Sequence, residues 1–274
     1  MILLGASASR RLYWFLSSPL LHLQNITVLR GSKAALDNLT LEIGLGEHVA
    51  ILGPNGCGKS TLIKTITREC YPLARLGSSL SILGRETWNV FDLRALLGIV
   101  SHDLMNTFTR DLTGREVVLS GFFSSVGVFA HQDVTAAMRE QADNALARLE
   151  ATRLADRLTN EMSSGEARRV LLARALVHNP RALLFDEPGT SLDLFAQHEL
   201  QLIMRKLAQS GIGIVLVTHH LADIIPEIER VILMRDGRIV ADGRKSEILT
   251  AERLSALFQL PVSLAERNGY YNLW

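Results

Sequence analysis

A glycine-rich run, GPNGCGKST, has the residue types and spacing of a loop that binds phosphate. It fits the pattern GxxxxGK[ST] and stands between a short apolar segment, 48–52, and a helical pattern. Glycines let successive backbone N–H groups approach phosphate oxygens, and the following helix directs its positive end at the same anion. Lys59 is expected to reach the outer phosphates, and the Ser60 hydroxyl to ligate Mg²⁺. A glycine-rich turn that only caps a helix is the alternative. The candidate phosphate-binding residues are Gly53, Pro54, Asn55, Gly56, Cys57, Gly58, Lys59, Ser60 and Thr61.

Two adjacent acids, Asp186 and Glu187, follow a second apolar segment, 182–185. A buried strand that ends in adjacent carboxylates is unusual for packing alone, because each charge needs a partner or water. Phosphate-bound Mg²⁺ supplies such a partner. We therefore expect Asp186 in the coordination sphere of the metal and Glu187 to polarise the water that attacks the γ-phosphate. A surface strand end with two solvated acids is the alternative.

With these two motifs and the residues around them, the chain resembles the ABC (ATP-binding cassette) ATPase family over about residues 21–258. The segment MSSGE stands where that family has its LSGGQ signature, with Ser163 and Gly165 matching and the first, third and fifth positions differing. A serine and a glycine at a helix N-terminus form an anion site. The resemblance implies that this site contacts the ATP of a partner subunit, whereas an ordinary helix cap is the alternative. The signature residues are Ser163, Ser164, Gly165 and Glu166.

Two further matches follow in the family's order. Ser191-Leu192-Asp193 resembles the D-loop, which links the two sites across a dimer, so Asp193 is assigned to it. His219 ends an apolar segment at the position of the switch histidine, where the resemblance implies a hydrogen bond from the imidazole to the γ-phosphate. A lone histidine at a strand end is otherwise structural, and we interpret the adjacent His220 in that way.

Two positions depart from the family's pattern. Arg30 stands where the family has an aromatic residue that stacks on adenine. A guanidinium plane also stacks on a base, with less specificity, so a preference for ATP over GTP follows from the resemblance alone. His102 replaces the Q-loop glutamine, which contacts Mg²⁺ and the membrane subunit. We expect weaker or pH-dependent coupling at this position.

The elements that must position these residues alternate between strand and helix. The dipeptide Asp236-Gly237, between apolar segments, indicates a two-residue hairpin. This order predicts an α/β fold: a P-loop NTPase core with a mainly parallel sheet, an antiparallel β subdomain near the N-terminus and a helical insertion subdomain. Strands are expected at 21–29, 36–43, 48–52, 182–185, 212–217, 231–234 and 238–241, helices at 59–68, 168–177 and 194–209, and a helix-rich region at 113–158.

We assign residues 21–274 to one ATP-binding domain, with the helical subdomain at about 103–165. The apolar stretch 113–130 within it is either the core of this subdomain or the groove that receives a helix of a membrane subunit. Residues 1–20 contain no acid and are expected to form a poorly ordered extension. The sequence Ser9-Arg10-Arg11 leaves a targeting signal as the alternative.

Composition excludes several classes of partner and compartment. The chain has 29 Lys and Arg against 28 Asp and Glu, so no basic surface for nucleic acid is expected. No run of 18 apolar residues occurs, so another subunit must span the bilayer in any membrane process. Cys57 and Cys70 are too few for a disulfide framework. The expected location is the cytoplasm, peripheral on the cytoplasmic face of the membrane.

The resemblance implies a head-to-tail homodimer around two ATP molecules, with Mg²⁺ as the second cofactor. It also implies an integral-membrane permease as a partner and leaves a substrate-binding protein as a further one. The SSGE spelling and the apolar stretch resemble the molybdate or metal-chelate importer branch, so we expect the ATP-hydrolysing subunit of an importer of a metal, an oxyanion or a metal-chelate. A soluble, non-transport ABC ATPase and a P-loop phosphotransferase are the alternatives.

Overall fold

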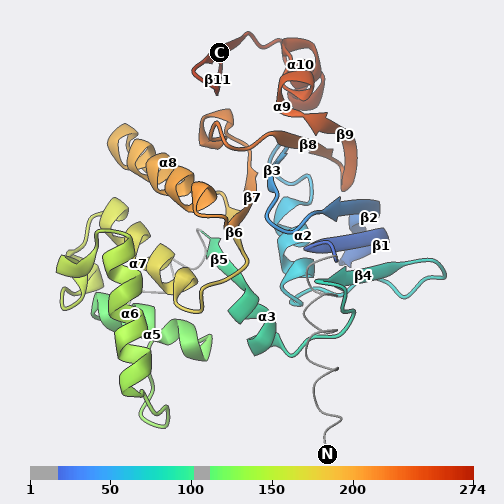
Figure 1. Cartoon of the computed structure of the whole chain (residues 1–274). Coiled ribbons are helices and arrows are strands. Elements are labelled where there is room, and N and C mark those ends of the chain that lie inside the picture. The colour runs from blue at the N-terminus through green and yellow to red at the C-terminus, as the bar shows by residue number, and fades with distance from the viewer. Residues whose placement is uncertain (1–17, 102–111) are drawn as a thin grey trace, which may run out of the picture.

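A six-stranded sheet forms the centre of the computed structural model, which describes residues 18–101 and 112–274 (Figure 1). Its strand order is β5-β6-β7-β3-β8-β9, in which the first five strands are parallel and β9 pairs antiparallel with β8. The mainly parallel sheet predicted from the sequence is therefore confirmed. The bounds are β3 (His48–Leu52), β5 (Leu97–Ser101), β6 (Ala182–Asp186), β7 (Gly213–Thr218), β8 (Arg230–Arg235) and β9 (Arg238–Arg244).

The central strands are buried on both faces, which explains why they read as continuous apolar runs. Along β3, Val49 and Ile51 belong to a core shared with helix α2 (Lys59–Ile66). Ala50 and Leu52 belong to a second core, shared with helix α8 (Leu194–Gln209). The carboxyl ends of β3, β6 and β7 meet at one edge of the sheet, where ligands of open α/β folds bind.

A smaller antiparallel sheet near the N-terminus has the order β2-β1-β4 and shares the core of α2. It consists of β1 (Leu21–Arg30), β2 (Lys33–Ile43) and β4 (Ser79–Ile82). The antiparallel subdomain is thus confirmed. Leu20 is already buried in this core, and its carbonyl accepts a hydrogen bond from the Leu83 N–H at 3.0 Å. Residues 1–17 of the predicted extension, with Ser9-Arg10-Arg11, lie outside the described residues.

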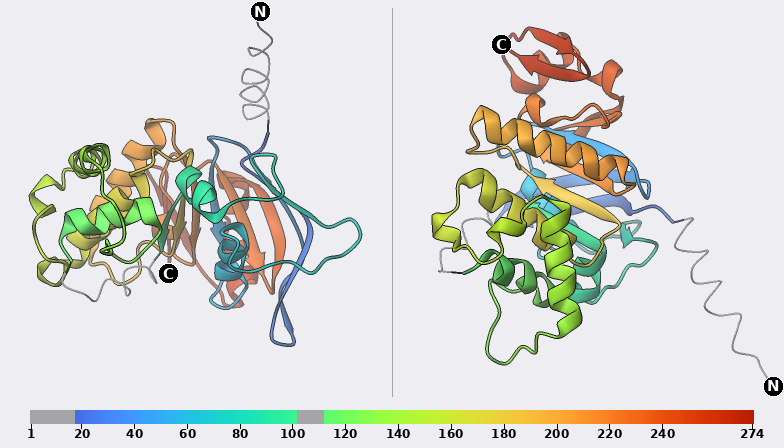
Figure 2. Two further views of the ribbon diagram at one scale, coloured as in Figure 1. Left: turned by 90° about the horizontal axis from the view of Figure 1, so that it is seen from below. Right: turned by 60° about the vertical axis from the view of Figure 1, so that its left-hand side comes forward.

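Three helices gather beside the sheet, as Figures 1 and 2 show. They are α5 (Gly114–Phe123), α6 (Ala136–Arg148) and α7 (Ser164–Leu176), with the short 3₁₀ turns η1 (Thr152–Leu154) and η2 (Thr159–Glu161) before α7. Val117, Val118 and Leu119 of α5 are buried in the core that α6 and α7 share. The first part of the stretch 113–130 is therefore core, whereas its second part is mostly half-buried and ends at the exposed Phe129 and Ala130.

Several element boundaries differ from the prediction. Helix α2 ends at Ile66, before Arg68 turns to a φ of 64°. Helix α7 begins at Ser164, four residues before the predicted start. Residues 69–96, for which no element was predicted, contain β4 and α3 (Val90–Leu96).

The C-terminal region was not assigned from the sequence. It forms α9 (Lys245–Ile248), α10 (Ala251–Phe258) and a hairpin of β10 (Leu264–Arg267) and β11 (Tyr270–Leu273). Strand β11 lies against the 3₁₀ turn η3 (Leu221–Asp223), which begins two residues after His219. Within the described part of the chain, no helix combines the length and the apolar character needed to cross a membrane.

Candidate functional site

The glycine-rich loop leaves β3 at the carboxyl edge of the sheet, and two of its glycines have no room for a side chain. A Cβ on Gly53 would lie 2.2 Å from the Met234 carbonyl oxygen. Gly58 has a φ of 110°, and a Cβ there would lie 2.3 Å from the Ala35 carbonyl oxygen. The Gly237 N–H donates to the Cys57 carbonyl at 2.8 Å. The predicted Asp236-Gly237 hairpin turn, with φ values of 50° and 76°, therefore braces the loop.

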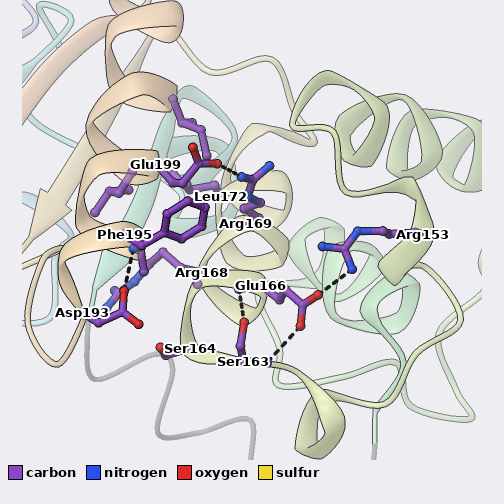
Figure 3. Close-up of a pocket in the computed structure, with 14 residues that line it drawn as sticks. Arg153, Ser163, Ser164, Glu166, Arg168, Arg169, Leu172, Asp193, Phe195 and Glu199 are labelled. Atoms are coloured by element: carbon purple, nitrogen blue, oxygen red, sulfur yellow. Dashed lines mark hydrogen bonds and ion pairs between the residues drawn. The ribbon is translucent and has the colours of Figure 1, made fainter.

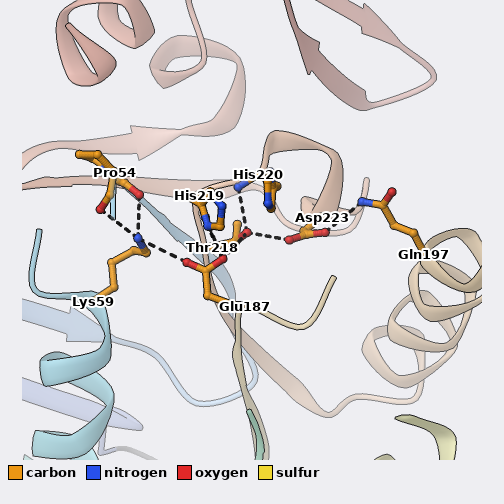
Figure 4. A network of polar contacts seen from close by, with 9 residues as sticks. Pro54, Lys59, Glu187, Gln197, Thr218, His219, His220 and Asp223 are labelled. Atoms are coloured by element: carbon orange, nitrogen blue, oxygen red, sulfur yellow. Dashed lines mark hydrogen bonds and ion pairs between the residues drawn. The ribbon is translucent and has the colours of Figure 1, made fainter. Parts of the chain in front are cut away.

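Lys59 starts α2 and bends back over the loop (Figure 4). Its ammonium donates to the Gly53 carbonyl at 2.7 Å and to the Pro54 carbonyl at 3.1 Å. It also lies 3.4 Å from Glu187 Oε1, although the lysine side chain is only 5% exposed. The two sequence motifs therefore meet in space. The hydroxyl-bearing Ser60 is exposed at the start of the same helix.

The other loop residues differ in exposure. Asn55 and Gly56 are exposed, and Thr61 is half-buried. Cys57 is buried and unpaired, and burial raises the pKa of its thiol. Cys70 is also free, so the described cysteines form no disulfide.

Glu187 follows β6 in a left-handed conformation, with a φ of 50°. Its backbone N–H donates to the Val217 carbonyl of β7 at 2.8 Å, which fixes the carboxylate beside the end of that strand. Glu187 Oε2 lies 2.5 Å from His219 Nδ1 and accepts from the His219 backbone N–H at 3.3 Å. The structure thus brings Lys59, Glu187 and His219 together (Figure 4).

Asp186 and Ser60 are the predicted metal ligands, and both offer oxygen donors of the kind that Mg²⁺ prefers. Asp186 ends β6, in register with Val217 of β7, and is half-buried. Across residues 18–101 and 112–274, no three or more His, Cys, Asp or Glu side chains are grouped to hold a metal ion. The donor set fits Mg²⁺ of the type that is held by one or two protein oxygens together with phosphate and water.

The predicted signature residues form the N-terminal cap of α7. The Glu166 N–H donates to Ser163 Oγ at 3.2 Å, and the Ser163 N–H donates to Glu166 Oε2 at 3.0 Å, so the capping-box alternative is present. Glu166 also pairs with Arg153 at 2.6 Å and with Arg157 at 3.2 Å. The Ser163 N–H and these guanidinium groups lower the pKa of Glu166. Ser164 is exposed beside the cap.

Asp193 caps α8, accepting from the Ala196 N–H at 2.8 Å. The N-terminal halves of α7 and α8 line a pocket of about 290 Å³ (Figure 3). All four signature residues and Asp193 line it, whereas Lys59 and Glu187 do not. A Cβ on Gly165 would lie 3.3 Å from the Ala196 Cβ, so the two helix ends approach closely. The predicted site residues therefore form two separate groups.

One predicted residue with a described position, Arg30, belongs to neither group. Arg30 is exposed at the end of β1, where its Nη1 lies 3.7 Å from Cys70 Sγ. His102, the predicted Q-loop position, lies outside the described residues.

Sequence reasoning missed Asp223, a buried acid in η3 that is 3% exposed. Thr218 Oγ1 donates to Asp223 Oδ2 at 2.6 Å, and Gln197 Nε2 of α8 donates to Asp223 Oδ1 at 3.2 Å (Figure 4). Burial raises the pKa of Asp223, and these hydrogen bonds oppose that effect. An acid within the apolar stretch 221–225 was the available signal, because such an acid needs a buried partner.

Comparison with known proteins places these features in context. The ABC transporter family matches residues 36–190. The chain is 31% identical over 248 residues to the uncharacterized ABC transporter ATP-binding protein YlmA of Bacillus subtilis, covering 89% of this chain and 92% of the relative. It is 32% identical over 250 residues to the hemin import ATP-binding protein HmuV of Aliivibrio fischeri, with coverage of 89% and 92%.

Two solved structures resemble the fold closely. One is cbiO1 from Clostridium perfringens, part of the ABC transporter complex cbiONQ, at 26% identity and a TM-score of 0.73, covering 88% of this chain and 94% of that one. The other is a dimeric ATP-binding cassette in a post-hydrolysis state bound to ADP and phosphate, at 29% identity and a TM-score of 0.66, covering 82% and 98%.

Proposed function

The chain belongs to the ABC transporter family, as an ATP-binding subunit that couples ATP hydrolysis to transport, and we propose that Lys59, Glu187 and His219 form its hydrolysis site. The approach of Lys59 Nζ to Glu187 Oε1, at 3.4 Å, carries this proposal. It joins the phosphate-binding loop to the acid that would act on the attacking water. The experiment that tests it is steady-state ATP hydrolysis by variants of these three residues.

ATP binding would change the partners of Lys59. The ammonium now contacts two loop carbonyls and Glu187, and the outer phosphates would take over these contacts. Glu187 would then lose its cationic neighbour and turn to the water. When Mg²⁺ is bound through Ser60 and Asp186, it offsets the negative charge of the phosphates. Binding of the phosphates to Lys59 would therefore at the same time free the Glu187 carboxylate from its ion pair with that lysine.

His219 would turn from Glu187 to the γ-phosphate and donate a hydrogen bond there. We expect His219→Ala to lower kcat by about a hundredfold, because one donor to developing charge is lost. The KM for ATP should change little, since the loop holds the other phosphates. Phosphate release measured under saturating ATP checks this. His198→Ala, which removes an exposed histidine of α8, is the control, and equal rates for both variants would contradict the role.

The separation of the two groups of residues supports a head-to-tail homodimer. In such a dimer the signature pocket of one chain would cover the ATP held by the Lys59 loop of its partner. Glu166 would place a negative charge near that triphosphate. Arg153 and Arg157, which pair with it, would offset this charge. The resemblance to a dimeric ATP-binding cassette supports the same assembly.

The adenine would be held by Arg30, through stacking of the guanidinium on the base. We expect Arg30→Ala to raise the Kd for ATP about fivefold and Arg30→Tyr to restore it, because stacking contributes about 1 kcal/mol. Lys33→Ala removes one positive charge from the facing position of β2 and is the matched control. Titration with ATP and GTP by calorimetry checks the change. If Lys33→Ala weakens binding as much, general electrostatics rather than stacking is responsible.

We propose the cargo and the remaining partners by analogy with the relatives. The curated relatives include hemin import ATP-binding proteins, which supports import of a metal-chelate over a free metal or an oxyanion. The chain would bind a permease at the cytoplasmic face of the membrane, and a substrate-binding protein would deliver the cargo. Uptake of hemin and of molybdate by vesicles that contain the permease and this chain would test the class of cargo. Phosphorylation of a small acceptor instead of release of phosphate would indicate a phosphotransferase.

A further inference from the structure

Asp223 joins three segments that surround the hydrolysis site. Its carboxylate accepts from Thr218 at the end of β7 and from Gln197 on α8. It also packs against the turn after Glu187, because a Cβ on Gly189 would lie 2.2 Å from Asp223 Oδ1. Since Asp223 is 3% exposed and Thr218 is fully buried, solvent does not compete for these contacts.

The Thr218 hydroxyl stands between two carboxylates and has one proton to donate. It lies 2.6 Å from Asp223 Oδ2 but 3.5 Å from Glu187 Oε2, so the proton goes to Asp223. The hydroxyl oxygen also accepts from the His220 N–H at 3.0 Å. Asp223 thereby fixes the orientation of the hydroxyl and keeps its proton away from Glu187.

The other carboxylate oxygen of Asp223 accepts a hydrogen bond from α8, the helix whose N-terminal half lines the signature pocket. Gln197 lies one turn after Asp193, the residue that caps α8. A buried arginine of the signature helix, Arg168, is 2% exposed and donates to the Thr190 carbonyl at 3.4 Å. Burial lowers the pKa of Arg168 to about 10, and the negative charge of Asp223 opposes this shift. Each helix that lines the signature pocket thus has one side chain that contacts this region: Gln197 of α8 bonds to Asp223, and Arg168 of α7 bonds to the turn at Thr190.

We propose that Asp223 is a positioning residue for ATP hydrolysis, which keeps the Thr218 hydroxyl from donating to Glu187 and ties the orientation of that hydroxyl to α8 through Gln197. The inference rests on the proposed role of Glu187. It adds a route within one chain from the signature pocket to the hydrolysis site. A shift of the first turn of α8 would change the hold of Gln197 on Asp223, and so the orientation of the Thr218 hydroxyl beside Glu187.

Two glutamines of α8 provide the matched comparison. Gln197 donates to the Asp223 side chain, and Gln201 donates to the Ala222 carbonyl at 2.6 Å, one helical turn further on. In the full-length chain, Gln197→Ala should lower kcat about fivefold and Asp223→Asn about tenfold, the scale of one hydrogen bond to a charged group. The KM and Kd for ATP should stay within twofold of wild type. Gln201→Ala should retain the wild-type kcat.

A double variant separates positioning from simple loss of structure. In Asp223→Asn, the new amide can donate to Thr218 and release the hydroxyl proton toward Glu187. Thr218→Val removes that hydroxyl, so Thr218→Val/Asp223→Asn should be no slower than Asp223→Asn alone. Additive losses in the double variant would overturn the proposal. So would a kcat for Gln197→Ala equal to that of Gln201→Ala, even if Asp223→Asn proved too unstable to assay.

The proposed function is tested separately by Glu187→Gln. If wild type hydrolyses ATP and Glu187→Gln does not, the hydrolysis site stands, and the Asp223 proposal is decided by the kcat of the Gln197 and Gln201 variants. If Glu187→Gln retains wild-type activity, Glu187 has no catalytic role and both proposals are overturned. Loss of ATP affinity in Gln197→Ala with an unchanged kcat would overturn the Asp223 proposal alone.

Discussion

Replacement of Glu187 by glutamine should lower the kcat for ATP hydrolysis about a thousandfold and leave ATP binding intact. The amide retains the shape of the side chain but cannot accept a proton from the attacking water. The neutral side chain also ends the ion pair with Lys59, which then remains available to the phosphates. Phosphate release and the Kd for ATP, measured on the same protein, check both parts of this expectation.

The same variant should accumulate as an ATP-bound dimer, since hydrolysis no longer opens the interface. Light scattering after size exclusion, with and without ATP, measures the change in mass. Glu252→Gln, on the exposed surface of α10, should behave as wild type in every assay. A Glu187→Gln chain that stays monomeric under saturating ATP would speak against the head-to-tail dimer but not against the catalytic role.

Replacement of Lys59 by alanine should weaken ATP binding about a hundredfold, since charge-assisted hydrogen bonds to phosphate are lost. The variant also leaves the loop carbonyls and Glu187 without their cationic partner. Calorimetric titration with ATP gives the affinity, and thermal unfolding shows whether the fold survives. Hydrolysis should fall at low ATP concentration in proportion to the lost affinity.

Lys64→Ala is the control for Lys59, because it removes a lysine from the other end of α2. It should bind ATP as wild type does. A Lys59→Ala chain that is folded and binds ATP with unchanged affinity would refute the phosphate-binding assignment of the whole loop.

Burial decided which elements the sequence could predict. Strands β3, β6 and β7 are sandwiched between two cores, so their residues must be apolar and the runs are recognisable. Strand β4 has four residues, and only Leu80 and Ile82 are buried, which leaves too short a pattern to recognise. The C-terminal hairpin is mostly half-exposed and is held by tertiary contacts. Lys245 Nζ, for example, donates to the Gly269 carbonyl at 3.3 Å.

Site residues were likewise predictable where they lie in a local sequence motif, and not where their role depends on contacts between distant segments. Lys59 and Glu187 were predictable because each lies in a contiguous motif whose chemistry requires those residue types. Asp223 was not, because its partners Thr218 and Gln197 come from separate elements and acquire their role by packing. Arg168 was missed for a related reason, since nothing in the sequence shows that this arginine is buried.

The alternation along β3 has a consequence for how the protein tolerates change. Neighbouring side chains of this strand pack into the two different hydrophobic cores, so the position of the turn that follows it depends on the packing of both cores. Gly53 is further bonded to Thr218 on the adjacent strand and packed against Met234. Repacking of either core is therefore expected to disturb the nine residues that we propose bind the nucleotide. A core mutation far from that turn should then lower ATP hydrolysis without touching the site.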